Sequence, residues 1–173
     1  KSTLVQLMNA LNLPLEGMVE VAGIKIYPKN KELLKPVRRY VGLVFQFPEY
    51  QLFEETVIKD VMFGPKNFLG KNADVLEEAK LALKMVNLDP ALYDRSPFNL
   101  SGGQMRKVAI AGILAYNPDI LLLDEPTRGL DPKTADEIMD LFYEIHTKYN
   151  KTIILISHDM NLVYKYSTRI VVM

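Results

Sequence analysis

A serine followed by two glycines, Ser101-Gly102-Gly103, stands directly before an apolar stretch of helical character. Inside a helix each glycine costs about 1 kcal/mol relative to alanine, so the pair is better placed at a helix N-terminus that a ligand approaches closely. The N–H groups and the dipole of such an end favour an anion. With Gln104, this stretch predicts an anion-binding edge for phosphate. The equally weighted alternative is that Ser101 is only an N-cap before a flexible turn.

Four polar side chains occupy equivalent places in the sequence, because each follows an apolar segment of strand length by no more than two residues. They are Gln46 after residues 41–45, Asp124 and Glu125 after residues 120–123, and His158 after residues 152–156. Ligands of open α/β sheets bind beyond the carboxyl ends of the strands. We therefore expect these side chains to gather on one edge. The structural alternatives are a polar strand end, a solvated turn and a histidine held near a helix start.

The first residues, Lys1-Ser2-Thr3, precede an apolar-periodic segment that predicts a helix. They match the last positions of the phosphate loop G-x-x-x-x-G-K-[ST]. In that interpretation Lys1 reaches the β- and γ-phosphates of a nucleotide, Ser2 ligates Mg²⁺, and Thr3 lies near the α- or β-phosphate. A Lys-Ser pair is also common by chance, so the match depends on the motifs that follow.

Alternating strand and helix patterns predict an α/β fold with a parallel sheet. Short strands or a hairpin are expected within 17–26 and charged surface over 31–39. Buried strands are expected at 41–45, 120–123 and 152–156, and a final strand at 169–173. Helices are expected at 56–63, 75–86 with Asn72 as cap, 105–116, from Asp131-Pro132 onward and 159–166. Residues 49–103 read as a helical insertion between core segments 1–48 and 104–173.

The composition limits the classes of function. A chain of 173 residues, with 21 basic and 21 acidic side chains and no cysteine, predicts one domain without a basic nucleic-acid footprint, a disulfide framework or a cysteine metal site. No apolar run approaches the ~20 residues of a membrane span. The chain starts at Lys1 and ends within an expected strand. We therefore expect a piece of a longer protein, without its N-terminal strands, most of its phosphate loop and its C-terminal part.

The motifs occur in one order: Leu-Ser-Gly-Gly-Gln at 100–104, Leu-Leu-Leu-Asp-Glu-Pro-Thr at 121–127, Gly-Leu-Asp at 129–131 and Ser-His-Asp at 157–159. In this order they resemble the nucleotide-binding subunits of ATP-binding cassette (ABC) transporters, over the whole chain. The resemblance implies a P-loop NTPase (RecA-like) core with a mostly parallel sheet and an inserted helical ABC subdomain. It also implies ATP and Mg²⁺ as cofactors.

The resemblance also implies roles for the site residues. Asp124 would hold Mg²⁺ through water, and Glu125 would polarise the attacking water. Gln46 would touch both the metal and that water. His158 would contact the γ-phosphate, and Asp131 would lie at a dimer interface and help to couple two sites.

In the family two subunits pack head to tail. Ser101, Gly102 and Gly103 of one subunit would then close on the ATP held by Lys1 and Ser2 of the other. Two ATP molecules would join the subunits until hydrolysis releases them.

Residues 45–53 and 63–65 resemble the ATPases of energy-coupling factor (ECF) transporters, and residues 104–112 and 128–131 indicate the second of their two ATPase types. The resemblance implies import of a vitamin or a metal ion by a protein peripheral to the cytoplasmic face of the membrane. It implies a second ABC ATPase as partner, in a heterodimer or alternatively a homodimer. A transmembrane coupling protein would contact about residues 47–65, and a substrate-capturing membrane protein would associate indirectly.

Physical chemistry supports an interface in this segment. Tyr50, Leu52 and Phe53 are expected to be exposed, and such apolar patches often mark contacts. The acidic residues beside them, Glu49, Glu54 and Glu55, would suit a basic partner helix. The alternative is a hydrophobic plug of the subdomain itself.

Two other functions compete with transport. A soluble ABC ATPase that acts on DNA or ribosomes is disfavoured by the neutral charge, so no nucleic-acid partner is expected. A degenerate subunit that binds nucleotide without hydrolysis is disfavoured because Glu125 and His158 are both present.

Overall fold

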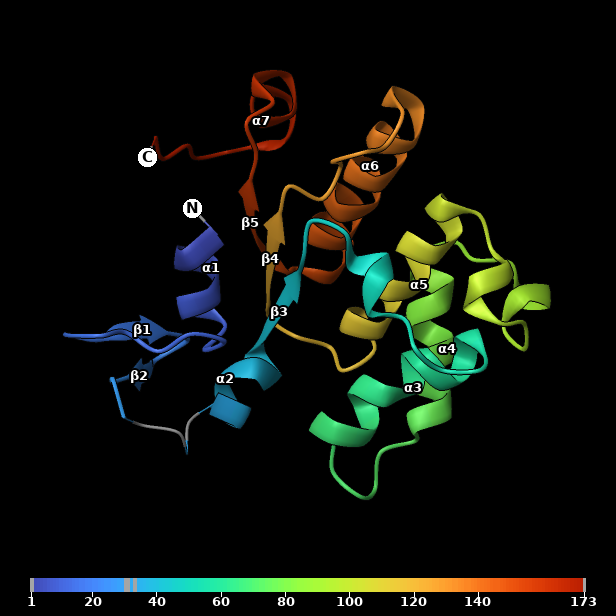
Figure 1. Ribbon diagram of the computed structural model, residues 1–173, viewed down its shortest axis with the longest axis horizontal. Helices are drawn as coiled ribbons and strands as arrows, with labels where there is room; N and C mark the ends of the chain where they lie inside the picture. Colours follow the sequence, from blue (N-terminus) through green and yellow to red (C-terminus); the bar gives the residue numbers. More distant parts are fainter. Residues whose placement is uncertain (1, 30–31, 33, 173) are drawn as a thin grey trace. The chain divides into compact units, whose positions relative to one another are not determined.

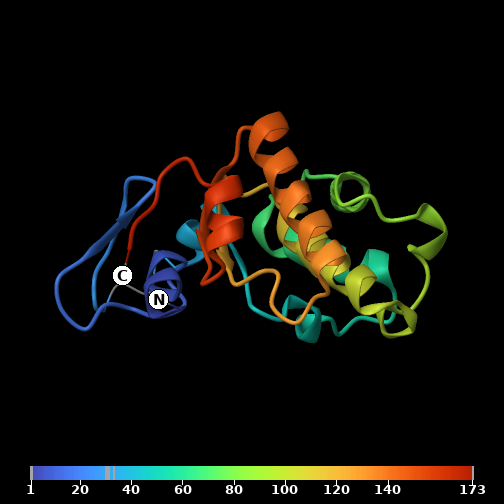
Figure 2. The same cartoon turned by 90° about the horizontal axis from the view of Figure 1, so that it is seen from above.

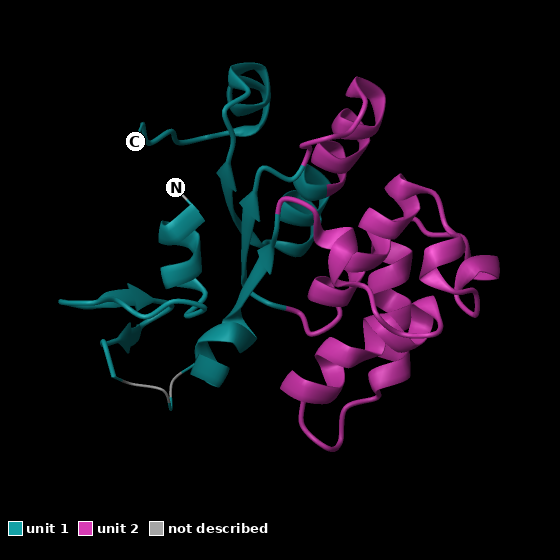
Figure 3. Cartoon of the chain, viewed as in Figure 1, with its two compact units in different colours: residues 1–45, 118–126, 142–173 teal, residues 46–117, 127–141 magenta. Residues whose placement is uncertain are grey.

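The computed structural model describes residues 2–29, 32 and 34–172 (Figure 1). Lys1, for which a phosphate contact was predicted, lies outside the described residues. The chain forms two compact units, unit 1 with residues 1–45, 118–126 and 142–173, and unit 2 with residues 46–117 and 127–141 (Figure 3). Unit 2 contains the expected helical segment 49–103 together with residues 46–48, 104–117 and 127–141.

Unit 1 is built on a parallel three-stranded sheet. Its strands are β3 (Val41–Val44), β4 (Ile120–Asp124) and β5 (Thr152–Ile156), side by side in the order β3-β4-β5. In register, Val41 lies opposite Ile120, and Ile120 lies opposite Thr152. Residues 121–123 are fully buried, as expected for the central strand of a parallel sheet. The sheet confirms the predicted α/β fold and its three strands. The expected burial of the third strand is wrong, because β5 is exposed at Thr152 and only partly buried over 153–156.

One face of this sheet contributes to the hydrophobic core of unit 1. The elements involved are α1 (Ser2–Met8), the antiparallel pair β1 (Val19–Val21) and β2 (Ile24–Ile26), and α2 (Leu34–Tyr40). Their buried residues form one apolar cluster: Val5, Ala10, Val21, Ile26, Val37, Val41, Leu43 and Leu122. The hairpin lies beside α1 in two views (Figures 1 and 2). Val37 is buried in this cluster, so the segment expected to be charged surface is an amphipathic helix.

Unit 2 is helical. Its elements are η2 (Pro48–Gln51), α3 (Val57–Phe68), α4 (Val75–Met85), η3 (Pro90–Leu92), η4 (Pro97–Asn99) and α5 (Gly102–Leu114). The helices α3, α4 and α5 pack against one another. Thr56 caps α3 by accepting a hydrogen bond from the Lys59 amide. The cap of α4 is Asp74 rather than the predicted Asn72.

The long helix α6 (Pro132–Tyr149) and the short α7 (Met160–Tyr166) complete the chain. Both begin where an aspartate was expected to start them. The predicted strand at 169–173 is wrong for the residues described, 169–172, because no described strand pairs with this segment. Val171 and Val172 are 73% and 93% exposed.

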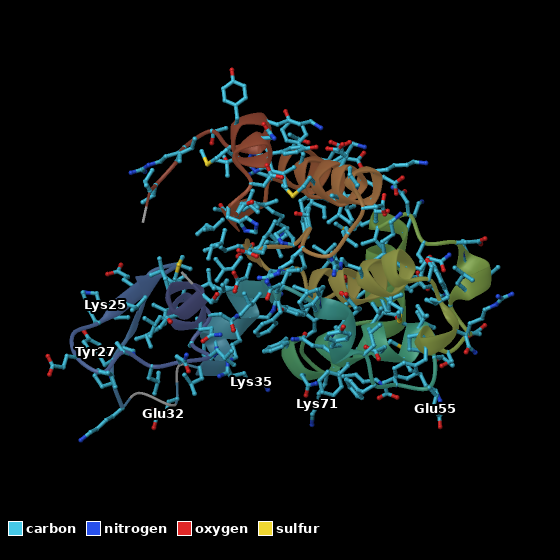
Figure 4. The ribbon with its side chains drawn as sticks, turned by 45° about the horizontal axis from the view of Figure 1, so that its top comes forward. Lys25, Tyr27, Glu32, Lys35, Glu55 and Lys71 are labelled. Carbon is cyan, nitrogen blue, oxygen red and sulfur yellow. The ribbon has the colours of Figure 1, made fainter. Side chains whose placement is uncertain are left out.

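Charged side chains such as Lys35 on α2 and Glu55 before α3 extend from the ribbon into solvent (Figure 4). Glu55 pairs with Lys59 at 2.7 Å, and this hydrogen bond lowers the pKa of Glu55. Both partners are exposed, so such a pair contributes little to the free energy of unfolding.

Candidate functional site

Two of the predicted site residues meet at the carboxyl edge of the sheet in unit 1. Glu125 follows β4 directly, and its amide donates to the carbonyl of Ile156 at 3.0 Å. Its Oε1 lies 2.9 Å from Nδ1 of His158, which follows β5 by two residues. The predicted convergence of Glu125 and His158 is therefore confirmed.

The backbone at Glu125 adopts φ of +49°, a left-handed conformation in a residue with a side chain. This conformation costs roughly 1–2 kcal/mol for an L-residue. Backbone strain of this kind concentrates at functional sites. Ala10, Ala22 and three asparagines share this backbone conformation, so it supports a role for Glu125 only together with the contact to His158.

Asp124 is the last residue of β4 and lies opposite Ile156 of β5. Ser2 and Thr3 lie at the exposed start of α1, a helix that packs against β4. The elements that carry Asp124 and Ser2 are therefore neighbours within unit 1.

Magnesium was predicted to bind at this edge. Among residues 2–29, 32 and 34–172, no group of three histidine, cysteine or acidic side chains forms a ready metal site. Mg²⁺ commonly uses only one or two carboxylates, several waters and substrate phosphates. A single carboxylate at a strand end and a hydroxyl on the neighbouring helix fit that sparse donor set, and they would be Asp124 and Ser2.

The predicted anion-binding edge is a helix N-terminus in unit 2. Ser101 caps α5 by accepting from the Gln104 amide at 3.3 Å, and its own amide donates to Oε1 of Gln104 at 3.0 Å. This reciprocal pair is a capping box, which fixes the end of the helix. Ser101 is thus an N-cap, and two hydrogen bonds hold the turn; its predicted contact with phosphate stays a prediction.

The two glycines that follow are not required by contacts within the chain. A Cβ at Gly102 would meet no atom within 4 Å, and one at Gly103 would meet only the Thr134 methyl group, at 3.5 Å. Both have helical backbone, which any residue can adopt. The space in front of this helix end is therefore open to something outside the chain, as a close-approaching phosphate requires.

Asp131 caps α6, and Thr134 N–H donates to its Oδ1 at 3.1 Å. Hydrogen bonds from the side chain and the backbone of Thr134 lower the pKa of Asp131. Asp131 is therefore a helix cap, whatever further role it has.

Gln46 follows β3 by two residues, is half-buried and belongs to unit 2. Its predicted convergence with Asp124 and Glu125, which belong to unit 1, stays a prediction.

Sequence reasoning missed one buried cation. Arg106, on α5, is 2% exposed and donates to both carboxylate oxygens of Glu49, at 3.0 and 2.7 Å. A charge within an otherwise apolar helical stretch was the available signal. Its partner lies 57 positions away in the chain, too far for sequence spacing to identify.

The expected apolar surface is only partly correct. Tyr50 and Phe53 are 83% and 57% exposed, but Leu52 is buried at 7%, where it acts as the hydrophobic plug considered above. Phe53 packs edge-on against the half-exposed Phe63 with 5.0 Å between ring centroids. Glu49 is bound to Arg106 and is only 14% exposed, so the acidic rim expected for a partner does not include it.

Known proteins share this sequence. A profile of the ABC transporter family matches residues 1–128. The energy-coupling factor transporter ATP-binding protein EcfA2 of Bacillus subtilis (strain 168) is 53% identical over 175 residues, covering 100% of this chain and 63% of that protein. The protein of the same name from Latilactobacillus sakei subsp. sakei (strain 23K) is 51% identical, with 100% and 60% covered. The chain thus spans less than two thirds of these relatives.

Solved structures share the fold. The structure of cbiO1 from Clostridium perfringens, described as part of the ABC transporter complex cbiONQ, has a TM-score of 0.83 and 37% identity, covering 95% of this chain and 65% of that one. The ATP-binding cassette MJ0796, in a dimeric post-hydrolysis state with ADP and Pi, has a TM-score of 0.79 and 34% identity, covering 93% and 71%.

The chain therefore belongs to the ABC transporter family, and its sheet and helices are those of an ABC ATPase cassette. Its resemblance to the second ATPase type of ECF transporters is confirmed by the name that its curated relatives carry. Within the part of the chain that the structure describes, no helix is both long and apolar enough to cross a membrane.

Proposed function

We propose that this chain is the ATP-binding and ATP-hydrolysing part of a subunit that powers a membrane importer of the ECF type. The observation that carries the proposal is the 2.9 Å contact between Glu125 and His158 beyond the carboxyl ends of two adjacent parallel strands. Phosphoryl transfer to water needs a positioned base and charge stabilisation around the γ-phosphate. A carboxylate and an imidazole at this edge supply both.

In this mechanism Glu125 polarises the attacking water, and its hydrogen bond to His158 restricts the orientation of the carboxylate. His158, 74% exposed, is accessible to the γ-phosphate. Ser2 and Asp124 would hold Mg²⁺, which neutralises charge on the phosphates when bound. Gln46 would contact the same water. A correctly placed base contributes about 10²- to 10⁴-fold in rate.

The second anion edge acts on another subunit. Ser101, Gly102 and Gly103 would close on an ATP held by the partner ATPase, which explains why glycines stand where this chain itself leaves open space. Asp131, at the exposed start of α6, would lie at the same interface. The partner is a related ABC ATPase, in a heterodimer or a homodimer, and ATP-driven closure of the pair would perform the work.

The membrane contact would use the exposed aromatic surface, defined here as Tyr50, Phe53 and Phe63. Exposed aromatic side chains on a helical unit are typical anchors for a partner helix. We assign this surface to a transmembrane coupling protein at the cytoplasmic face of the membrane, with a substrate-capturing membrane protein associated through it. The cargo class is a vitamin or a metal ion.

Purification of the full-length Glu125→Gln protein from its native host, with ATP and mild detergent, tests this proposal. A preparation without nucleotide is the control. Co-purification of a second ABC ATPase with small membrane proteins, enriched by ATP, supports an ECF-type importer. Recovery of ribosomes, nucleic acid or soluble partners instead would contradict transport and leave ATP hydrolysis standing.

A further inference from the structure

Arg106 is the largest fully buried side chain of this protein among the described residues. Burial of a guanidinium group is unfavourable unless the surroundings supply hydrogen-bond acceptors. The next position of α5, Lys107, is only partly buried and carries a charge at a lower cost. The position of the charge inside unit 2 therefore calls for a function.

The guanidinium group binds two separate segments at once. Its Nε and Nη2 donate to Oε2 and Oε1 of Glu49 at 3.0 and 2.7 Å, a two-pronged arrangement that fixes both partners. Its Nη1 donates to the carbonyl oxygen of Arg128 at 3.1 Å. The same group lies 6.0 Å from the ring centroid of Phe47, within reach of a cation–π attraction.

A second contact joins those two segments directly. Gly129 has φ of +75°, and a Cβ there would lie 3.2 Å from Cε1 of Phe47. The loop 127–131 thus lies against the segment 46–51, and Arg106 bonds to both of them. All of these residues belong to unit 2.

Each of the three joined segments carries a residue of the proposed mechanism. Segment 46–51 starts with Gln46 and contains Tyr50 of the exposed aromatic surface. Arg106 itself lies five positions after the cap Ser101. The loop 127–131 ends with Asp131.

We propose that Arg106 is a positioning residue, whose guanidinium group ties segment 46–51, the start of α5 and loop 127–131 into one body. Displacement of the aromatic surface by a membrane partner is then transmitted to the signature end of α5 and to Asp131 together. This inference rests on the proposed ATPase function and adds the physical link between partner contact and nucleotide closure.

The test separates positioning from folding with a double variant of the full-length protein. Removal of one partner of a buried ion pair leaves an unpaired buried charge, whereas replacement of both by apolar residues of similar volume is often neutral for stability. Arg106→Met combined with Glu49→Leu should therefore melt within about 4 °C of the parent protein. The double variant nevertheless lacks the bond to the Arg128 carbonyl.

With the link lost, hydrogen exchange of the amides in 46–51 and 127–131 should be faster than in the parent. The kcat for ATP hydrolysis should fall about 10- to 100-fold, the range expected for misplaced reacting groups, while KM for ATP stays within about twofold. Parent-like exchange and parent-like kcat in a stable double variant would overturn the proposal.

Arg106→Lys is the second variant and decides the matter if the double variant does not fold. A lysine keeps the charge beside Glu49 but lacks the fork that also reaches the Arg128 carbonyl. It should show the same faster exchange in loop 127–131 and a reduced kcat. A lysine variant with parent values in both would refute the link.

Lys107→Met is the matched control, because it removes a positive charge from the next position of α5 and Lys107 has no ion pair within the described chain. It should keep parent exchange rates in both segments. If the parent protein itself hydrolyses no ATP, the proposed function fails, and the exchange measurements alone decide the link. If the parent hydrolyses ATP but the variants match it throughout, only the link fails.

Discussion

At the residue scale, the backbone of Glu125 separates the two acidic neighbours at the end of β4. Asp124 stays in the strand ladder opposite Ile156, whereas Glu125 turns into the left-handed region and contacts His158. Two adjacent carboxylates can therefore serve different tasks, one for the metal and one for water. The strain at Glu125 is local and is offset by the fold around it.

His158→Ala should lower kcat for ATP hydrolysis by about 10- to 100-fold, because Glu125 loses the hydrogen bond that orients it. The free energy of unfolding should change by less than about 0.5 kcal/mol, since His158 is exposed. Phosphate release and thermal unfolding check the two parts. The control is His146→Ala, because His146 makes a local hydrogen bond with the Lys151 carbonyl and should keep parent turnover. Equal losses in both variants would argue against the role of His158.

The cap at Asp131 should make stability depend on acid pH. Its pKa is lowered in the folded chain by the hydrogen bonds from Thr134. A carboxyl group of lowered pKa stabilises the fold above its unfolded pKa, and this contribution is lost as the pH falls through the folded value. The difference in urea midpoint between the parent and Asp131→Ala should thus be full at pH 6 and shrink below about pH 4. A difference that stays constant would contradict the assignment.

At the scale of elements, α3 and α5 pack closely because a glycine lets them. A Cβ at Gly64 would lie 2.7 Å from the Gly112 carbonyl oxygen and 2.8 Å from Cδ1 of Tyr116. Helix α3 also continues past Gly64-Pro65 to Phe68, where the sequence predicted an earlier end. The ring of Phe68 then packs on Tyr116 with 4.7 Å between centroids.

Gly64→Ala should destabilise the protein by about 1–3 kcal/mol, because α3 and α5 must separate to accommodate the methyl group. Urea unfolding of the full-length protein measures it. Gly112→Ala is the matched control, because Gly112 lies in the facing helix and a Cβ there would meet nothing within 4 Å. This variant should raise the free energy of unfolding by about 0.5–1 kcal/mol, since alanine is more stable than glycine inside a helix. Destabilisation by Gly112→Ala, or none by Gly64→Ala, would show that the helices are not packed in this way.

Elements with a strong local pattern could be predicted from the sequence. The strands β4 and β5 contain continuous apolar runs, at 120–123 and 153–156, and α5 and α6 start at recognisable caps. The strand predicted at 169–173 is wrong over its described residues, 169–172, because β-propensity needs a neighbouring strand, which sequence does not reveal. Asn72 and Asp74 are both residue types that can cap a helix. In the structure the Glu77 amide donates its hydrogen bond to the carboxylate of Asp74, so Asp74 is the cap. The burial of Leu52 and Arg106 depends on distant partners.

At the scale of the whole molecule, the chain carries surfaces that its own fold does not use. The open space before Gly102 and the exposed rings of Tyr50 and Phe53 both belong to unit 2. Asp60, 9% exposed, accepts from the amides of Phe53 and Glu54 at 2.8 and 2.9 Å. The loop that displays the aromatic surface is thus held in place before any partner binds.

Tyr50→Ser should weaken assembly with membrane partners by about 30-fold or more, the loss typical of an aromatic anchor, and should affect basal ATP hydrolysis less. Co-purification yield and phosphate release measure the two effects. Tyr164→Ser on α7 is the control, since that tyrosine is 88% exposed and lies outside the proposed interface. Leu52→Asp should also reduce the stability of the protein, because Leu52 is buried. Equal loss of assembly and hydrolysis in Tyr50→Ser would count against the interface.

The most direct test of the account is the rate of phosphate release by the full-length protein with Mg²⁺ and ATP, compared with Glu125→Gln. Glu137→Gln, an exposed position on α6, is the control. We predict that Glu125→Gln binds ATP within a few-fold of the parent and turns over about 10²- to 10⁴-fold more slowly, while Glu137→Gln matches the parent. Parent-like turnover in Glu125→Gln would contradict the assignment of the catalytic base and with it the proposed mechanism.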